Sequence, residues 1–454
     1  MVRWLRAAAV LAVGYGCLLP LFRPRGAYLG GHYRLLDLYL GALALWVAIW
    51  LSLYLAAGTA QQRRTGALRW LLAGLVGGGT LLLLDLGVAL LTPGNFWFDS
   101  LNLFPGVNRP DPEFGFRGRP RIRDWVLRRA VTRPGRTELY VARHRTDGNG
   151  FRNPTDISVA PLLFLGDSYT HGVDLPREET FVGQVERELG MVALNLAWIG
   201  FGPQQELLAL RKYGLAARPQ WVVWQLFEGN DLQDAERFDA WRRDPRPPAI
   251  SASLRYVTRS PLVRLLDRTV LHPPPTPPAT FVRYPSGQRR SEPLLHLYDP
   301  HLPTARSAGM RRLWEALTAR AELCRRNGAR LLVVVLPIPV RALQPVLEFD
   351  SSTERTRLLP AGNFDADTDF CATLQREAPG RGIELTDLTE PMRARARRSP
   401  DLFLPTDGHL DREGHRVVAE EILNWIRSRS GGGGEGSGPR AGGRGRPGGS
   451  KTRS

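Results

Sequence analysis

The sequence predicts an α/β fold, a doubly wound α/β/α sandwich with a mainly parallel five-stranded sheet, preceded by an N-terminal helical membrane region. Three long apolar runs near the N-terminus indicate the membrane region. Beyond about residue 155, short apolar segments alternate with amphipathic helical patterns, which is typical of a parallel sheet covered by helices on both faces. A chain of 454 residues is long enough to hold such a domain and attached segments.

The apolar runs lie at about Trp4–Phe22, Leu35–Ala57 and Ala67–Leu91, so residues 1–92 are predicted to form about three transmembrane helices. The second and third runs reach the roughly 20 residues that cross a bilayer. The first run is shorter and is also compatible with a signal peptide. No small-x-small cleavage site follows it, which favours an uncleaved anchor.

Arginines in the short loops predict the orientation, because positively charged loops stay on the cytoplasmic side. Three spans that start inside place more arginines on the inner side than on the outer side: Arg3, Arg6, Arg63, Arg64 and Arg69 against Arg23, Arg25 and Arg34. Everything after Leu91 is then expected on the outer, periplasmic face of the cytoplasmic membrane.

The soluble part begins with a polar stretch, residues 93–154, which is expected to be a connecting segment with some short strands. Residues 155–429 carry the alternating pattern of the α/β domain. The predicted strands are Pro161–Leu165, Val192–Ala197, Trp221–Phe227, Arg330–Leu336 and Ile383–Leu388. The predicted helices are Thr180–Leu189, Gln204–Leu215, Ala305–Asn327 and Arg412–Arg427.

An insertion at about residues 232–303 is rich in proline and arginine and is too long for a connection in a compact domain. It is expected to form a lid or a surface elaboration over the site. Residues 430–454 are rich in glycine and arginine and have nothing to pack, so they are predicted to be disordered.

Charge and cysteine content narrow the function classes. The formal net charge is +17, but only Lys212 and Lys451 are lysines, and the arginines are scattered along the chain. No zinc spacing, RNP-type strand or basic heptad accompanies this charge, which argues against nucleic-acid binding. An anionic lipid leaflet is the more natural partner. Three cysteines form no metal framework, and whether Cys324 and Cys371 form a disulfide stays open.

Four polar features follow predicted strands or precede the last helix. Ser168 lies in "GDSYTHG" after the first strand, Gly200 in "NLAWIGFG" after the second, and Asn230 in "FEGNDLQD" after the third. Asp407 and His409 lie in "PTDGHLDREGH" just before the final helix. Because ligands collect at the carboxyl ends of parallel strands, we expect these residues at one edge of the sheet.

The residue types fit a serine nucleophile. A hydroxyl is a poor nucleophile near neutral pH and needs a base within hydrogen-bond reach, itself oriented by a third group. Ser168, His409 and Asp407 supply these three roles. The N–H groups of Ser168 and Gly200 and the side-chain amide of Asn230 are candidate oxyanion donors. No metal or cofactor is required.

In this order the blocks resemble the SGNH/GDSL hydrolase superfamily, over about Pro161–Ile426. The resemblance implies a flavodoxin-like α/β/α sandwich and a carboxylic-ester hydrolase. It assigns the nucleophile to Ser168, the oxyanion contacts to Gly200 and Asn230, and the base and its orienting group to His409 and Asp407.

Three positions depart from the family pattern. The usual leucine after the serine is Tyr169, which is expected to change the lining of the pocket and not the chemistry. Gly229 precedes Asn230 directly, without the common spacer. One residue instead of two separates Asp407 from His409, as in SGNH-like domains of bacterial polysaccharide O-acetylation, which points toward acyl transfer.

Other polar residues near the blocks have plainer interpretations. His171 is badly placed to face Ser168 from the same helix, and His415 is expected to face solvent or to pack inside the final helix. Asp411 is interpreted as the cap of that helix and Asp167 as a structural hydrogen-bonding residue. Two aromatic residues are equally compatible with a sugar platform, a pocket wall or the core: Trp198 and Phe201.

The sequence therefore favours a membrane-anchored serine esterase that removes O-acyl groups, in particular O-acetyl groups, from envelope carbohydrate. One alternative is an O-acetyltransferase that passes the acyl group to a polysaccharide hydroxyl together with a multispan membrane acyltransferase. Another is a non-catalytic glycan-binding or assembly protein, which the presence of all four catalytic residue types disfavours. The expected partners are the acylated carbohydrate and the cytoplasmic membrane.

Overall fold

The computed structural model describes residues 107–244, 280–291, 307–359, 369–405 and 408–430, with a few positions between Thr59 and Asp85. The three apolar runs lie almost wholly outside the described residues, as does the tail after Ser430. Within the described part of the chain, no helix has both the length and the apolar character needed to cross a bilayer.

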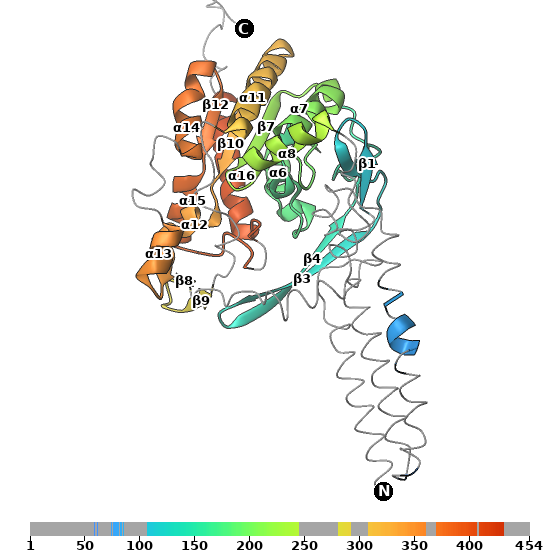
Figure 1. Ribbon diagram of the computed structural model, residues 1–454. Coiled ribbons are helices and arrows are strands. Elements are labelled where there is room, and N and C mark those ends of the chain that lie inside the picture. The colour runs from blue at the N-terminus through green and yellow to red at the C-terminus, as the bar shows by residue number, and fades with distance from the viewer. Residues whose placement is uncertain are drawn as a thin grey trace, which may run out of the picture.

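A five-stranded sheet forms the centre of the domain (Figure 1). Its order is β12-β10-β7-β5-β6, and every neighbouring pair is parallel. This order corresponds to the flavodoxin-like arrangement 2-1-3-4-5. The strands are β5 Leu162–Leu165, β6 Ala193–Asn195, β7 Trp221–Phe227, β10 Arg330–Leu336 and β12 Glu384–Asp387. The predicted five-stranded parallel sheet is therefore confirmed.

Helices cover both faces of the sheet. Successive strand residues point to opposite faces, so each strand packs against helices on both sides. Val222 and Trp224 of β7 belong to one buried cluster, together with residues from the helices at 203–209, 308–326 and 370–377. Trp221 and Val223 belong to a second cluster, together with residues from the helices at 181–189, 389–396 and 412–430. The two clusters make the strands apolar throughout, which is why they read as continuous apolar runs.

The helices are α5 Ser168–His171, α6 Phe181–Leu189, α7 Pro203–Ala209, α8 Asp231–Arg243, α11 Ala308–Arg326, α12 Pro339–Leu343, α13 Ser352–Leu358, α14 Phe370–Glu377, α15 Thr389–Ala396 and α16 Arg412–Ser430. Four of them, α6, α7, α11 and α16, correspond to the predicted helices, and the others were not predicted. Thr180 caps α6 and Ser307 caps α11, each through a side-chain oxygen that accepts a backbone N–H. A π-helical turn, Leu210–Gly214, and a 3₁₀ turn, Leu215–Ala217, follow α7. Three further 3₁₀ turns are Arg177–Glu179, Gln344–Val346 and Pro379–Arg381.

Antiparallel strands surround the sandwich. In the expected connecting segment the structure describes two hairpins, β1 Asn108–Asp111 with β2 Gly115–Gly118 and the longer β3 Trp125–Arg133 with β4 Arg136–His144. In the expected insertion it describes α8 and two strands, which form a small sheet with β11: β8 Thr280–Arg283, β9 Arg289–Ser291 and β11 Leu347–Phe349. The tip of the β3–β4 hairpin lies beside β9 (Figure 1).

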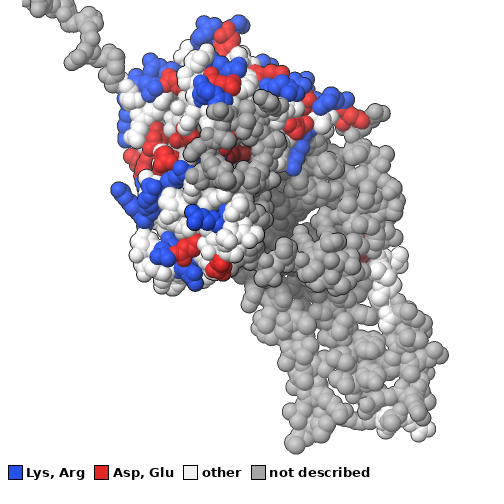
Figure 2. Space-filling model, turned by 60° about the vertical axis from the view of Figure 1, so that its left-hand side comes forward, with Lys and Arg blue, Asp and Glu red and all other residues white. Residues whose placement is uncertain are grey.

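The fold settles the question of a disulfide, which the sequence left open. Cys324 and Cys371 are free, buried thiols, so they form no disulfide with each other. Basic and acidic side chains are interspersed on the face of the domain shown in Figure 2. Mixed charge of this kind is typical of an ordinary solvated surface.

Candidate active site

Ser168 is the first residue of α5, directly beyond the carboxyl end of β5. The chain turns at Gly166, whose φ is +153°. A Cβ at this position would lie 2.3 Å from Thr170 Oγ1, so only glycine permits the turn. Asp167 caps α5 by accepting the N–H of Tyr169 at 3.0 Å. The "GDS" sequence therefore places Ser168 just beyond the carboxyl edge of the sheet.

His409 contacts Ser168, although it lies near the C-terminal end of the domain's sequence. Its Nε2 lies 2.8 Å from Ser168 Oγ, although the two residues are 241 positions apart. The loop that carries it is pinned by backbone hydrogen bonds from Leu404 N to His409 O, at 2.7 Å, and from Gly408 N to Leu404 O, at 3.0 Å. An unprotonated Nε2 at this distance is placed to accept the serine proton.

Asn230 lies beside the serine turn. Its Nδ2 donates to Asp167 Oδ2 at 3.2 Å. Asp167 also receives a hydrogen bond from Gln225, once the Gln225 amide is oriented so that its nitrogen faces acceptors. Burial raises the pKa of Asp167, and the donors Tyr169 N, Asn230 and Gln225 oppose that rise. The interpretation of Asp167 as a structural hydrogen-bonding residue is therefore confirmed.

The loop with Gly200 follows β6 and is held against α5. Asn195, the last residue of β6, donates through Nδ2 to Thr170 O at 3.2 Å. Its side-chain oxygen accepts the N–H of Ala197 at 2.9 Å. Gly200 has a φ of +77°, a left-handed conformation that glycine adopts without strain. These contacts set the loop beside α5, and the oxyanion role of Gly200 stays a prediction.

Asp407 lies outside the described residues, so its role as the orienting group also stays a prediction. The structure brings Ser168 and His409 into direct contact. Asn230 donates a hydrogen bond to Asp167, the residue before Ser168. Among the described residues, no group of three or more His, Cys, Asp or Glu side chains is arranged to hold a metal ion.

Tyr169 has a different place from the one expected. Its side chain is 2% exposed, and its hydroxyl donates to Gly408 O at 3.1 Å. Its ring lies 5.0 Å from the His409 ring and 4.2 Å from that of Phe227, centroid to centroid. Tyr169 therefore supports the loop that carries His409 through buried contacts, instead of only lining a pocket.

Sequence reasoning missed Arg152 and Asn153. The buried guanidinium of Arg152 donates to the carbonyls of His171, Gly172 and Leu175, which fixes the chain after α5. Burial lowers the pKa of Arg152 to about 9. Asn153 exchanges hydrogen bonds with the backbone of Asn195 at the end of β6. Arg152 and Asn153 thus connect the loop after Ser168 with the strand that leads to Gly200. No local sequence pattern predicts this role.

Gln225 was also missed, but the sequence carries a signal for it. It is the one polar residue in the buried strand "WVVWQLF". A polar side chain in such a strand needs a hydrogen-bond partner, and Gln225 finds Asp167 and Thr170.

The other two histidines near the site have structural positions. His171 is buried, and its ring stacks on His144 with centroids 5.3 Å apart and meets Trp198 edge-on at 5.0 Å. Burial holds the pKa of His171 well below its ordinary value. His415 accepts the N–H of Phe181 at 3.2 Å, and burial lowers its pKa to about 3. Neither makes a hydrogen bond to Ser168 in the described structure.

The two aromatic residues weighed as a sugar platform belong to the core. Trp198 is fully buried, and its indole N–H donates to Asn108 Oδ1 at 2.8 Å. Phe201 is also fully buried and stacks on Phe114 with centroids 5.6 Å apart. They support the loop that carries Gly200.

A cluster of buried carboxyl groups packs behind the site. Burial raises the pKa of Glu206 to about 8 and that of Asp234 to about 7, and it raises the pKa of Asp231 as well. Arg320 lies 3.2 Å from the centroid of the Trp224 ring and opposes the rise at Glu206. Burial, reinforced by repulsion from neighbouring carboxylates that include Asp167, favours the protonated forms of these groups near neutral pH.

Proteins similar to this chain are found among solved structures. No protein-family model and no curated protein matches the chain. Among solved structures, it is similar to a GDSL-like lipase from Bacteroides thetaiotaomicron, with 14% identity, 59% of this chain and 88% of that chain covered, and a TM-score of 0.30. It is similar to a variant of an acetylxylan esterase from Geobacillus stearothermophilus, with 12% identity, 58% and 93% covered, and a TM-score of 0.30. A third is an acetyl xylan esterase from Butyrivibrio proteoclasticus, with 9% identity, 65% and 75% covered, and a TM-score of 0.30. At these identities and scores the functional interpretation rests on the contact between Ser168 and His409.

Proposed function

We propose that this protein is a serine esterase that works through an acyl-enzyme. The observation that carries the proposal is the 2.8 Å approach of His409 Nε2 to Ser168 Oγ at the carboxyl edge of the sheet. Ser168 Oγ attacks the ester carbonyl carbon while His409 takes its proton, and the alcohol leaves with that proton. Water activated by His409 then releases the acid and restores the serine.

Oxyanion stabilisation is assigned to three donors. They are the N–H of Ser168, the N–H of Gly200 and the side-chain amide of Asn230. The first N–H groups of a helix have no acceptor within the helix, so Ser168 N–H at the start of α5 suits this role. Asp407, two residues before His409, is assigned the role of orienting the imidazole.

The substrate we propose is an O-acyl group, in particular O-acetyl, on envelope carbohydrate outside the cytoplasmic membrane. The long apolar runs before residue 92 support an anchored domain, and the arginine distribution supports its outer position. The short Asp407-x-His409 spacing supports a second candidate function, in which the same acyl-enzyme transfers its acyl group to a sugar hydroxyl instead of water.

Replacing the nucleophile tests the mechanism. In the full-length protein, Ser168→Ala is expected to lower kcat on a chromogenic acetyl ester by at least about 1000-fold, since only residual catalysis by oxyanion contacts and binding persists. The control is Ser428→Ala near the end of α16, because that helix starts at the site and carries Ser428 to the opposite edge of the sheet. This control is expected to retain full activity.

The reaction products separate hydrolysis from transfer. Free acetate released from an acetylated oligosaccharide supports the esterase, and acetyl groups found on an added acceptor sugar support transfer. Full activity in Ser168→Ala would rule out the serine mechanism for both.

A further inference from the structure

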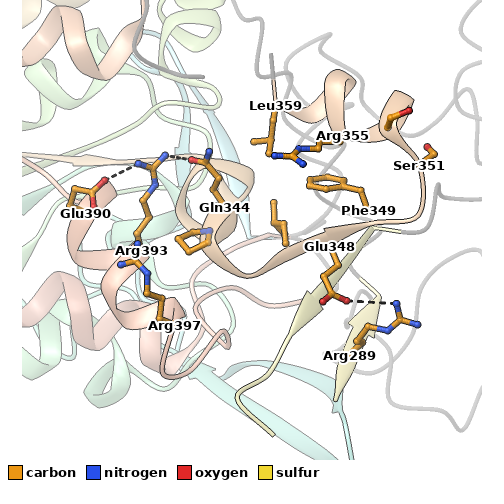
Figure 3. Close-up of a pocket in the computed structure, with 13 residues that line it drawn as sticks. Arg289, Gln344, Glu348, Phe349, Ser351, Arg355, Leu359, Glu390, Arg393 and Arg397 are labelled. Atoms are coloured by element: carbon orange, nitrogen blue, oxygen red, sulfur yellow. Dashed lines mark hydrogen bonds and ion pairs between the residues drawn. The ribbon is translucent and has the colours of Figure 1, made fainter. Parts of the chain in front are cut away.

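A second concave surface lies away from Ser168. It has a volume of about 830 Å³ and lies between the turn after α12, strand β11, helix α13 and helix α15. Ser168 and His409 are not among its lining residues. Figure 3 shows Arg393 and Arg397 on one side of it and Arg355 and Phe349 on the other. We name this surface the arginine pocket.

The arginine pocket carries an excess of positive charge. Arg289, Arg355, Arg393 and Arg397 line it, against two carboxylates. Each carboxylate is already paired: Glu348 lies 3.7 Å from Arg289, and Glu390 lies 2.8 Å from Arg393.

Two of the arginines have no carboxylate partner among the residues that the structure describes. They are Arg355 and Arg397, and both side chains are exposed. Arg393, in contrast, is held in place by Glu390, Gln344 and the carbonyl of Arg341. A fixed guanidinium together with two exposed ones is suited to an anionic group, because the N–H groups of a guanidinium pair with the oxygens of a carboxylate, sulfate or phosphate.

Apolar side chains complete the arginine pocket. Leu347 and Phe349 of β11 and Leu359 after α13 line it together with Pro345. An apolar wall with a few convergent charged groups is the usual composition of a small-molecule site. A ring that bears an anionic substituent fits both parts, with its carbon face against Phe349 and its charge toward the arginines.

The arginine pocket and the serine lie at the same edge of the sheet. Helix α12 follows the carboxyl end of β10, and α15 follows that of β12, as α5 follows that of β5. Strand β10 is two positions from β5 and β12 is three, so the helices α12 and α15 start on the order of 10 to 15 Å along the edge from the start of α5. A short oligosaccharide spans such a distance.

We infer that the arginine pocket is a subsite for an anionic sugar of the polymer whose acyl group Ser168 removes. The anion is a carboxylate, sulfate or phosphate ester on a ring near the acylated one. This inference rests on the proposed esterase function and adds that the carbohydrate is acidic.

Kinetics on matched substrates test the subsite. The variant is Arg355→Gln/Arg397→Gln in the full-length protein, and the control is Arg398→Gln, an exposed arginine next to the pocket that does not line it. The substrates are an O-acetylated oligogalacturonate, an O-acetylated xylo-oligosaccharide of equal length and para-nitrophenyl acetate. We expect the double variant to raise KM about fivefold to tenfold for the acidic oligosaccharide alone, with kcat unchanged, and the effect to shrink with added salt.

Binding to the Ser168→Ala protein identifies the anion without turnover. Oligogalacturonate, a sulfated oligosaccharide and a phosphorylated oligosaccharide are titrated in parallel, with a neutral oligosaccharide and anionic lipid vesicles as comparisons. Tighter binding of one anionic sugar, weakened in the triple variant with Arg355→Gln and Arg397→Gln, supports the subsite and names its ligand class.

The two proposals fail differently. Equal KM values for acidic and neutral oligosaccharides, or an Arg398→Gln effect equal to that of the double variant, would overturn the subsite while the esterase stands. Arginine-dependent binding to vesicles and not to any acidic sugar would also overturn it. Acidic sugar binding without ester cleavage would instead remove the esterase and leave the pocket a glycan-binding site.

Discussion

At the scale of single residues, the site depends on buried side chains that fix the positions of Ser168 and His409. Asp167 and Gln225 fix the serine turn, and Tyr169 fixes the histidine loop through Gly408. Catalytic groups must stay close to their productive geometry, and displacements of about 1 Å can cost roughly 100-fold in rate. Tyr169 is therefore interpreted as a positioning residue that acts through His409.

Tyr169→Phe tests this role. The variant loses the hydroxyl that donates to Gly408 O but keeps the ring against Phe227. We expect kcat on a chromogenic acetyl ester to fall about tenfold with little change in KM, and the free energy of unfolding to fall by only about 1 kcal/mol. Tyr213→Phe is the matched control, since it removes a hydroxyl that accepts a hydrogen bond from Arg117. An equal loss of kcat in both variants would argue against a positioning role.

At the scale of elements, the β3–β4 hairpin becomes part of the site's support. Tyr140 of β4 donates to Asp411 Oδ1 at 2.9 Å, and Arg133 of β3 forms a buried ion pair with the same carboxylate. Asp411 lies two residues after His409 and directly before α16, where its side chain also accepts the N–H of Arg412 at 2.7 Å. The interpretation of Asp411 as a helix cap was therefore incomplete, because it also joins the hairpin to the histidine loop.

Asp411→Asn tests the link between hairpin and loop. Neutralising Asp411 weakens its buried pair with Arg133, which keeps only the carboxylate of Asp401 at 3.2 Å and that of Glu138 at 3.8 Å, so we expect the free energy of unfolding to fall by about 2 kcal/mol. The loop then loosens, and kcat should fall with it. Asp124→Asn removes an exposed carboxylate that pairs with Arg143 at the other end of the same hairpin, and it should leave both quantities nearly unchanged. Urea titrations and steady-state kinetics on the two variants give the comparison, and equal behaviour would contradict the link.

At the scale of the whole molecule, the buried carboxyl cluster makes stability depend on pH. The unfolded chain releases these protons near pH 4, whereas burial keeps the proton on Asp234 to about pH 7 and on Glu206 to about pH 8. Between those values the folded state binds more protons than the unfolded state. Stability therefore falls as the pH rises through this window.

Asp234→Asn tests this dependence. The variant keeps the size of the side chain but has no proton to lose, so the free energy of unfolding should fall less steeply between pH 4 and pH 7. We expect the difference in the free energy of unfolding between the variant and the unchanged protein to grow, in favour of the variant, by about 1 kcal/mol for each unit of rising pH in this range. Asp239→Asn, on the same helix but only partly buried, should keep the original slope. Urea titrations at several pH values measure both, and parallel slopes for Asp234→Asn and the unchanged protein would contradict the assignment.

The sequence by itself determined the sheet and the main helices around it. Strand β7 and strand β10 have the predicted limits, because strands buried on both faces are apolar throughout and turn residues bound them. The polar blocks at the strand ends also predicted which serine and histidine meet, since parallel strands bring their carboxyl ends to one edge.

Tertiary structure alone decided how the site is supported and what lies beside it. Arg152, Tyr169 and Asp411 act through contacts with residues distant in the chain, or with backbone carbonyls, and neither periodicity nor a motif encodes such contacts. The arginine pocket likewise gathers side chains from β9, β11, α13 and α15. In a sequence rich in arginine, only their folded positions distinguish these four arginines from the scattered ones.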